Sequence, residues 1–364
     1  MITISLAFLV SLVITFLVVR YSHLHEHFTA DWDLRSVQKY HAKPVPRIGG
    51  LGVAVSLLVV SVITWYRADV ATGTAMLKLA ACAVFAFGAG FWEDLTKSVS
   101  PRERLIATMV SALAASWILD ARISRVDVAL LDHFLSITAV SIAITALAVS
   151  GLANAINIID GFNGLASMVS MIMFLSLAYV AFQVGDALVL TIAFAMIGAI
   201  FGFFIWNFPG GLIFLGDGGA YLIGFMLAEL AILLIVRHPQ VSAWYPFLMV
   251  IYPIFETLFS IYRRRIVRGV PVGHPDGVHL HTLIYKRLMR WAVGSADHRH
   301  KLRRNSMTSP YLWLLSLFAV IPATLFWNNG IVLAIFSAIF VIFYVWIYWR
   351  IVRFQAPRWM IFKK

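Results

Sequence analysis

The sequence predicts an all-α integral membrane protein with about eleven transmembrane helices, and three observations lead to this fold class. First, 61% of the 364 residues are hydrophobic, 13% are charged and the mean hydropathy is +0.86. Soluble domains are closer to about half apolar and about a quarter charged. Second, apolar runs long enough to cross a bilayer recur along the whole chain. Third, lysine and arginine are concentrated in alternate loops.

Each expected helix is an apolar run long enough to span, for which roughly 20 residues are needed. The runs lie near residues 2–20, 48–66, 74–92, 104–120, 134–151, 164–183, 187–206, 219–236, 244–262, 310–327 and 331–349. Pro253 should bend the helix of 244–262, because proline removes a backbone donor and clashes with the preceding turn. No extended interruption divides the chain, so we predict one polytopic domain over residues 1–364.

The first run is predicted to be a retained helix and not a cleaved signal peptide. It is long enough to span, no charged segment precedes it, and no convincing small-residue cleavage site follows it. The single cysteine, Cys82, lies in an apolar run, so an intramolecular disulfide is excluded.

The basic residues predict which side each loop faces. With the N-terminus outside, 24 of the 29 lysines and arginines fall on one side of the membrane and 5 on the other. Basic loops stay in the cytoplasm, so the N-terminus is periplasmic and the C-terminus is cytoplasmic. The longest cytoplasmic loop is 263–309, which contains histidines. These loops explain the net charge of +12 without a nucleic acid partner, for which no motif is present.

Every polar cluster that could carry chemistry falls on this cytoplasmic face. The most prominent is residues 154–165, where three asparagines, one aspartate and two glycines lie between two apolar runs. Such polar groups are costly to bury without partners, and glycine allows a tight turn or a close approach to a ligand. Taken alone, this stretch also fits an ordinary polar turn, so its meaning depends on whether other polar segments converge on it.

Four carboxylates at helix ends, Glu93, Asp94, Asp160 and Asp217, share that face. Carboxylate and amide oxygens without cysteine suit Mg²⁺, with Mn²⁺ as the alternative, better than Zn²⁺. Residues 216–219 open a helix, whose free N–H groups could hold an anion, although a simple capped turn fits as well. Nearby cations that could hold phosphate are Lys43, Arg47, Lys97, Arg102 and Arg104.

Together these segments resemble the polyprenyl-phosphate N-acetylhexosamine-1-phosphate transferases of the WecA/MraY superfamily, closer to the WecA branch. The resemblance covers nearly the whole chain, through residues 46–50, 93–97, 154–164, 214–219 and 279–281. It implies an enzyme of the bacterial inner membrane with a cytoplasmic active-site cleft. The enzyme would transfer HexNAc-1-phosphate from a UDP-N-acetylhexosamine to undecaprenyl phosphate, releasing UMP.

The resemblance also assigns roles. Asp217 would be the main Mg²⁺ ligand, helped by Asn157. Glu93 and Asp94 would engage or deprotonate the lipid phosphate, and Lys97 would hold phosphate. Asp160 would line the nucleotide end of the cleft. The remaining substrate contacts would be Asn163 beside Asp160, Asn207 and Phe214 at the uracil, His279 and His281 at the diphosphate and sugar, and Arg47 and Lys43 at phosphate.

Three departures from the family pattern matter. Glu93 stands where many members have aspartate, which leaves open which carboxylate of the pair acts. Asn163 replaces an acid, so no base role belongs there. Thr282 follows His281, so the loop has neither the triple histidine of the peptidoglycan branch nor the His-x-His-His of many GlcNAc-type members. This disfavours a MurNAc-pentapeptide donor and favours initiation of O-antigen or another surface polysaccharide.

Two alternatives stay open. Within enzymes, the phospho-MurNAc-pentapeptide transferase of peptidoglycan synthesis is the second reading. A membrane transporter would need broken helices, an internal repeat and polar residues near the bilayer midplane, where only Glu229 and Glu256 lie. Glu256 is also close enough to Arg263 along the helix to pair with it. The identity of the HexNAc and the presence of a homodimer stay open.

Overall fold

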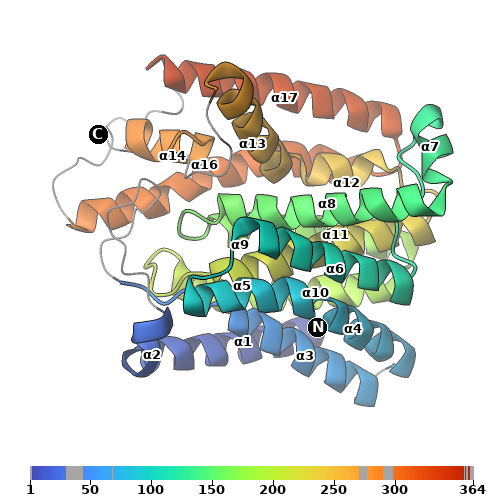
Figure 1. The fold of residues 1–364 in the computed structure, drawn as a ribbon, viewed down its shortest axis with the longest axis horizontal. Helices are drawn as coiled ribbons and strands as arrows, with labels where there is room; N and C mark the ends of the chain where they lie inside the picture. Colours follow the sequence, from blue (N-terminus) through green and yellow to red (C-terminus); the bar gives the residue numbers. More distant parts are fainter. Residues whose placement is uncertain are drawn as a thin grey trace.

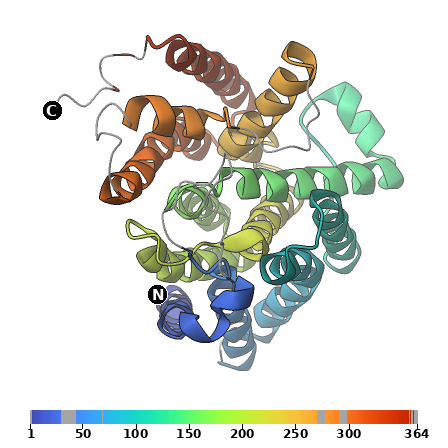
Figure 2. The ribbon, with the colours of Figure 1, turned by 60° about the vertical axis from the view of Figure 1, so that its left-hand side comes forward.

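The computed structural model describes residues 2–29, 44–67, 69–269, 277–289, 298–355, 357 and 360. Within these ranges every regular element is a helix, and most helices run along the long axis of one bundle (Figures 1 and 2). The all-α membrane fold is thereby confirmed.

Eight helices are individually long and apolar enough to cross a membrane. They are α1 (Ile2–Arg20), α3 (Gly50–Arg67), α8 (Thr138–Ile159), α9 (Leu165–Val184), α10 (Ala187–Asn207), α11 (Gly216–Arg237), α16 (His298–Leu325) and α17 (Gly330–Val352). A ninth span is formed if α4 (Val70–Cys82) and α5 (Val84–Thr96), which are bent by 45° at their junction, count as one. The run predicted as one helix over 74–92 is therefore two helices with a bend between them, and its crossing of the membrane stays a prediction.

The two remaining apolar runs are also helical. Residues 104–120 form most of α6 (Pro101–Ile118), and 244–262 form α12 (Trp244–Met249) and α13 (Ile251–Tyr262). The break between α12 and α13 lies at Val250, as expected because the ring of Pro253 clashes with the preceding turn. Neither run meets the length and composition of a single span, so the count of eleven stays a prediction.

The helix expected over 134–151 lies further along the chain, because α8 begins at Thr138 and continues to Ile159. Asn154 and Asn157 therefore lie on its last two turns and not in a loop. Asparagine lowers helix stability by less than about 1 kcal/mol, and both amides find partners on α11: Tyr221 donates to Asn154 Oδ1 over 3.2 Å, and Asn157 Nδ2 donates to Asp217 Oδ1 over 2.8 Å.

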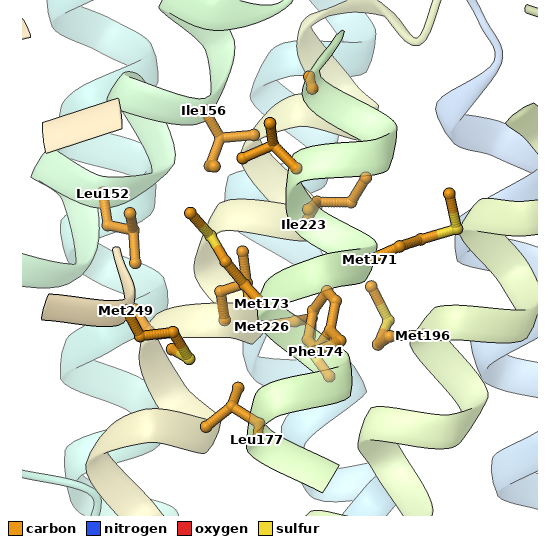
Figure 3. Close-up of a cluster of buried hydrophobic side chains, with 14 of the residues drawn as sticks. Leu152, Ile156, Met171, Met173, Phe174, Leu177, Met196, Ile223, Met226 and Met249 are labelled. Carbon is orange, nitrogen blue, oxygen red and sulfur yellow. The ribbon is translucent and has the colours of Figure 1, made fainter. Parts of the chain in front are cut away.

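α11 is the central helix, with 89% of its spanning window buried inside the protein. It packs against α3, α5, α8 and α9. Figure 3 shows part of this core, where Met173 and Phe174 of α9 gather with Ile223 and Met226 of α11. Because packing fixes α11 on all sides, it also fixes the position of its first turn.

The predicted loop 263–309 is largely helical where the structure describes it. It contains η1 (Arg263–Val267), α14 (Leu280–Leu283), η2 (Ile284–Met289) and the start of α16. The helix expected over 310–327 is therefore longer than predicted and begins at His298. Two shorter helices, α2 (Ser22–Thr29) and α7 (Ala129–Leu135), lie at opposite ends of the bundle (Figure 1).

Candidate active site

The first turn of α11 is capped by a carboxylate from another helix. Asp94, at the end of α5, accepts a hydrogen bond from Asp217 N through Oδ1 and one from Gly218 N through Oδ2, each over 2.9 Å. Asp94 is fully buried, and a negative charge at a helix N-terminus is stabilising. The N–H groups of Asp217 and Gly218 thus bind the protein's own carboxylate, in the place where the sequence suggested an anion such as a substrate phosphate.

Asp217 is surrounded by polar partners from three other segments. Its Oδ1 accepts from Asn157 Nδ2 over 2.8 Å and from Arg47 Nη2 over 3.3 Å. Its Oδ2 forms an ion pair with Arg104 of α6. Arg47 also lies 3.9 Å from Asp94, measured from Nε to Oδ1. Two guanidinium groups therefore balance two buried carboxylates in one cluster, which we call the Asp217 cluster.

Arg47 reaches this cluster because its segment pairs with the segment before α11. Phe214 N donates to Pro46 O over 2.8 Å, and Gly50 N donates to Leu215 O over 2.8 Å. The two backbones come so close that a β-carbon on Gly50 would collide with the backbone of Gly219. Glycine is required at this crossing for steric reasons. Phe214, the predicted uracil contact, is half-buried at the same crossing.

Asp160 lies directly after the last residue of α8 and within electrostatic reach of both Arg47 and Asp94. Burial raises the pKa of its carboxyl group well above the usual range, and the charge of Asp94 adds to this, while Arg47 opposes it. The turn that follows, residues 161–164, contacts the histidine segment: the ring centroids of Phe162 and His281 are 5.6 Å apart.

The two histidines are positioned by Glu256, which comes from α13. His279 and His281 stack with centroids 5.0 Å apart. Glu256 Oε1 lies 3.1 Å from His279 Nδ1 and accepts from Leu280 N over 2.8 Å, and Oε2 accepts from the hydroxyl of Tyr344 over 2.8 Å. Glu256 therefore supports the histidine segment. The sequence also allowed Glu256 to pair with Arg263. The hydrogen bonds of Glu256 instead go to His279, Leu280 and Tyr344.

Glu93 and Lys97 shape the turn after α5. Glu93 Oε2 accepts from Val99 N over 2.7 Å, and Lys97 Nζ donates to Asp94 O over 2.6 Å. Lys97 adopts a positive φ of 58° and is exposed. Lys97 therefore contacts the main chain of Asp94, and Glu93, which is half-buried, holds the turn that follows α5.

The side chains of Asn163 and Asn207 form hydrogen bonds with main-chain groups of the turn 161–164 and of the segment 209–213. Asn163 Nδ2 donates to Pro209 O over 3.1 Å. Asn207 Oδ1 accepts from Gly164 N over 2.6 Å, and its Nδ2 donates to Ile213 O over 2.8 Å. Both residues are buried, so the geometry favours a role in positioning the turn 161–164 over the predicted contacts with nucleotide. Lys43 lies outside the described residues.

Sequence reasoning missed one residue of this site and undervalued two others. The missed residue is Asn305 of α16, which accepts from Asn163 N over 2.8 Å, across 142 residues of sequence. Glu256 was singled out as an intramembrane carboxylate, but not as the partner of the histidine segment. Arg104 appeared only as one of several cations. The capping box of Ser100 and Glu103 could have indicated its importance, because it fixes the first turn of α6, next to Arg104.

The site suits a cation that takes few protein ligands. Among the described residues, no three or more His, Cys, Asp or Glu side chains form a group that could hold a metal, which does not fit a closed zinc site. Mg²⁺ instead binds one or two carboxylates together with substrate phosphates. Asp217 can supply such a carboxylate. Asn157 can supply a second oxygen beside it, because Asn157 uses its Nδ2, and not its side-chain oxygen, in the hydrogen bond to Asp217.

An apolar groove approaches the histidine segment from the side. Its volume is about 450 Å³, and it is lined by aromatic and aliphatic side chains of α13 and α17, among them Phe255, Phe259 and Tyr348. Arg263 lines the groove as well and donates through Nη1 to Val278 O over 2.6 Å. Because Val278 directly precedes His279, the groove reaches the histidine segment.

Comparison with known proteins supports the family that the sequence resembles. Residues 76–235 match the model "Glycosyl transferase family 4". The chain is 29% identical, over 77% of its length and 77% of the relative, to the Bacillus subtilis protein "Probable undecaprenyl-phosphate N-acetylglucosaminyl 1-phosphate transferase". It is 26% identical to the Thermotoga maritima "Undecaprenyl-phosphate alpha-N-acetylglucosaminyl 1-phosphate transferase", over 70% of this chain and 72% of the relative.

A relative with another donor in its name is also similar. The chain is 25% identical to a "Phospho-N-acetylmuramoyl-pentapeptide-transferase" of Caldicellulosiruptor bescii, over 65% of this chain and 75% of the relative. The family match includes Asp94, Arg104, Asp160 and Asp217, the residues that the structure brings to one end of the bundle. The match over residues 76–235 and the names of the relatives therefore support the WecA/MraY superfamily of membrane phosphoglycosyl transferases, which the sequence resembles.

Proposed function

We propose that the protein transfers HexNAc-1-phosphate from a UDP-N-acetylhexosamine to undecaprenyl phosphate, giving undecaprenyl-diphosphate-HexNAc and UMP. The observation that carries this proposal is the Asp217 cluster, which lies at helix ends near both a histidine segment and an apolar groove. Relatives named for GlcNAc-1-phosphate transfer support the donor class. The enzyme would act at the cytoplasmic face of the inner membrane and begin O-antigen or another surface polysaccharide.

The transfer needs two phosphates brought together and their charge neutralised. A phosphate oxygen of the lipid attacks the β-phosphorus of the donor, and the bond from that phosphorus to the bridging oxygen breaks, so the electron pair leaves with UMP. Arg47, Arg104 and Lys97 would bind the diphosphate, since phosphoryl transfer depends mainly on positioning and electrostatic stabilisation. Asp217 with Asn157 would hold Mg²⁺, which supplies charge neutralisation when bound.

The remaining residues position these groups. Asp94 uses both carboxylate oxygens to cap α11, so we assign it to holding Asp217 in place. Glu93 lies nearer to solvent and would engage the lipid phosphate. His279 and His281 would contact the diphosphate and the sugar, and the groove along α13 would take the prenyl chain. Arg47 and Arg104 pair with Asp217 and would bind the diphosphate once Asp217 holds the cation.

The function is tested by an assay with membranes that contain the protein, Mg²⁺ and undecaprenyl phosphate. Each labelled donor is tested in a separate reaction. The donors are UDP-linked GlcNAc, FucNAc, QuiNAc, GalNAc and MurNAc-pentapeptide. We expect label from one UDP-HexNAc in a prenyl-linked product, with an equimolar amount of UMP. Transfer from UDP-MurNAc-pentapeptide alone would favour the second candidate, which the names of several relatives support. No product from any UDP-sugar, where a known transferase is active, would exclude both.

Glu256→Gln tests the support of the histidine segment. The amide keeps the shape but removes the charge that stabilises hydrogen bonds from His279, Leu280 and Tyr344. A hydrogen bond to a charged group contributes about 1.5–3 kcal/mol, so we expect kcat to fall roughly tenfold or more. Initial rates of UMP release measure this, with Asp120→Asn at the opposite end as control. An unchanged kcat would show that the histidines do not depend on Glu256.

A further inference from the structure

The end of the bundle opposite the Asp217 cluster contains a second cavity, of about 540 Å³. α11 has 22 residues, so about 33 Å along its axis separate the two ends. The cavity lies between the segment 239–244, which follows α11, and the turn that begins α17. Ligand-binding pockets have volumes of roughly 300–1,000 Å³, and this cavity is within that range.

A closed set of hydrogen bonds holds one wall of the cavity. Arg125 Nη2 donates to Pro239 O over 3.2 Å and to Val241 O over 2.5 Å, and Nη1 pairs with Asp127 Oδ1 over 2.5 Å. Asp127 Oδ2 accepts from Ser242 Oγ over 2.8 Å and from Ala243 N over 2.7 Å. The wall is thus preformed, and its two charges neutralise each other.

The rest of the lining combines an aromatic ring with neutral amides. Trp244 is half-buried and packs on Phe247. Gln240 and Asn328 are exposed. Asn329 caps α17 by accepting from Val332 N over 3.2 Å, which uses its oxygen and not its Nδ2. Amide side chains both donate and accept hydrogen bonds, so this lining suits a ligand with many hydroxyl groups and no net charge.

We propose that this cavity binds a neutral saccharide. The apolar C–H face of a sugar ring can pack on the indole of Trp244, and Ile331 and Ala334 line the same cavity. Sugar hydroxyls would bond to Gln240 and Asn328. A charged ligand would find only the paired Arg125 and Asp127. The sugar could belong to a free oligosaccharide or to the head group of a glycolipid, because both present the same ring.

The test uses the full-length protein in phosphatidylcholine nanodiscs, titrated by calorimetry with a neutral trisaccharide of N-acetylglucosamine. We expect saturable binding, with Kd raised about fivefold in Gln240→Ala and again in Asn328→Ala, as expected for the loss of one hydrogen bond each. Gln183→Ala removes an exposed amide at the same end of the bundle but outside the cavity, and should leave Kd unchanged.

A second experiment distinguishes a free oligosaccharide from a glycolipid head group as the ligand. Nanodiscs with a neutral monoglucosyl lipid should raise the melting temperature of the unsubstituted protein, but not of the Gln240→Ala, Asn328→Ala double variant, if the head group is the ligand. Binding in only one arm identifies the source. No saturable effect in either arm, or effects that the cavity variants leave unchanged, would overturn the proposal. Transfer activity, which should stay unchanged, reports that each variant is folded.

Discussion

Replacing Asp217 with asparagine should lower the rate of sugar-phosphate transfer at least about a hundredfold. Asp217 is the carboxylate that contacts Asn157, Arg47 and Arg104 together. The substitution preserves the shape of the side chain and the N–H that bonds to Asp94, so α11 should still form. It removes the charge that balances two guanidinium groups and would hold the cation.

The measurement is the initial rate of UMP release, normalised to the amount of folded protein. Asp120→Asn is the matched control, because Asp120 is an exposed carboxylate at the other end of α6, and it should keep the full rate. A wild-type rate in Asp217→Asn would remove Asp217 from the chemistry, although the cluster would still exist as a structural feature.

Asp94→Ala should have a different signature, with stability and activity lost together. The alanine leaves the N–H groups of Asp217 and Gly218 without their acceptor in a buried position. Each unsatisfied group costs about 1–3 kcal/mol, and the first turn of α11 would move to find other partners. Asp94→Asn should recover part of both properties, because its remaining oxygen can still accept one bond.

Thermal unfolding in detergent and UMP release, measured on the same preparations, distinguish two roles for Asp94. Loss of both supports a residue that positions Asp217. Lost activity with wild-type thermal stability would instead support direct action on the lipid phosphate, the role that the family resemblance assigns, and would contradict our assignment. Asp217→Asn serves as the comparison, since its loss should be mainly in activity.

The class of fold could be predicted because membrane insertion is a property of composition along the chain. Runs of apolar residues and the side of each basic loop need no knowledge of contacts. The helix bounds were less certain where polar residues find partners inside the bundle. Asn154 and Asn157 were expected in a loop, but the hydrogen bonds to Tyr221 and Asp217 let α8 continue past them. Those partners lie 60 residues or more away.

The segments of the site could be predicted, whereas their pairings could not. Glycine, carboxylate and amide clusters at predicted helix ends indicated which loops to compare. Nothing in local spacing indicated that Asp94 would cap α11, 123 residues further along the chain, or that Glu256 would support His279. Residues such as Asn163 and Asn207 look the same in sequence whether they bind a ligand or the main chain, and here their amides bind the main chain.

A divalent cation held by Asp217 is the chemical core of the proposed function, and Mn²⁺ tests it most directly because it is visible by electron paramagnetic resonance. The purified protein is titrated with Mn²⁺ in the presence of UMP. We expect one bound Mn²⁺ per chain, lost in Asp217→Asn, retained in Asp120→Asn and displaced by excess Mg²⁺. Equal binding in Asp217→Asn and in the unsubstituted protein would place the cation elsewhere and contradict the site described.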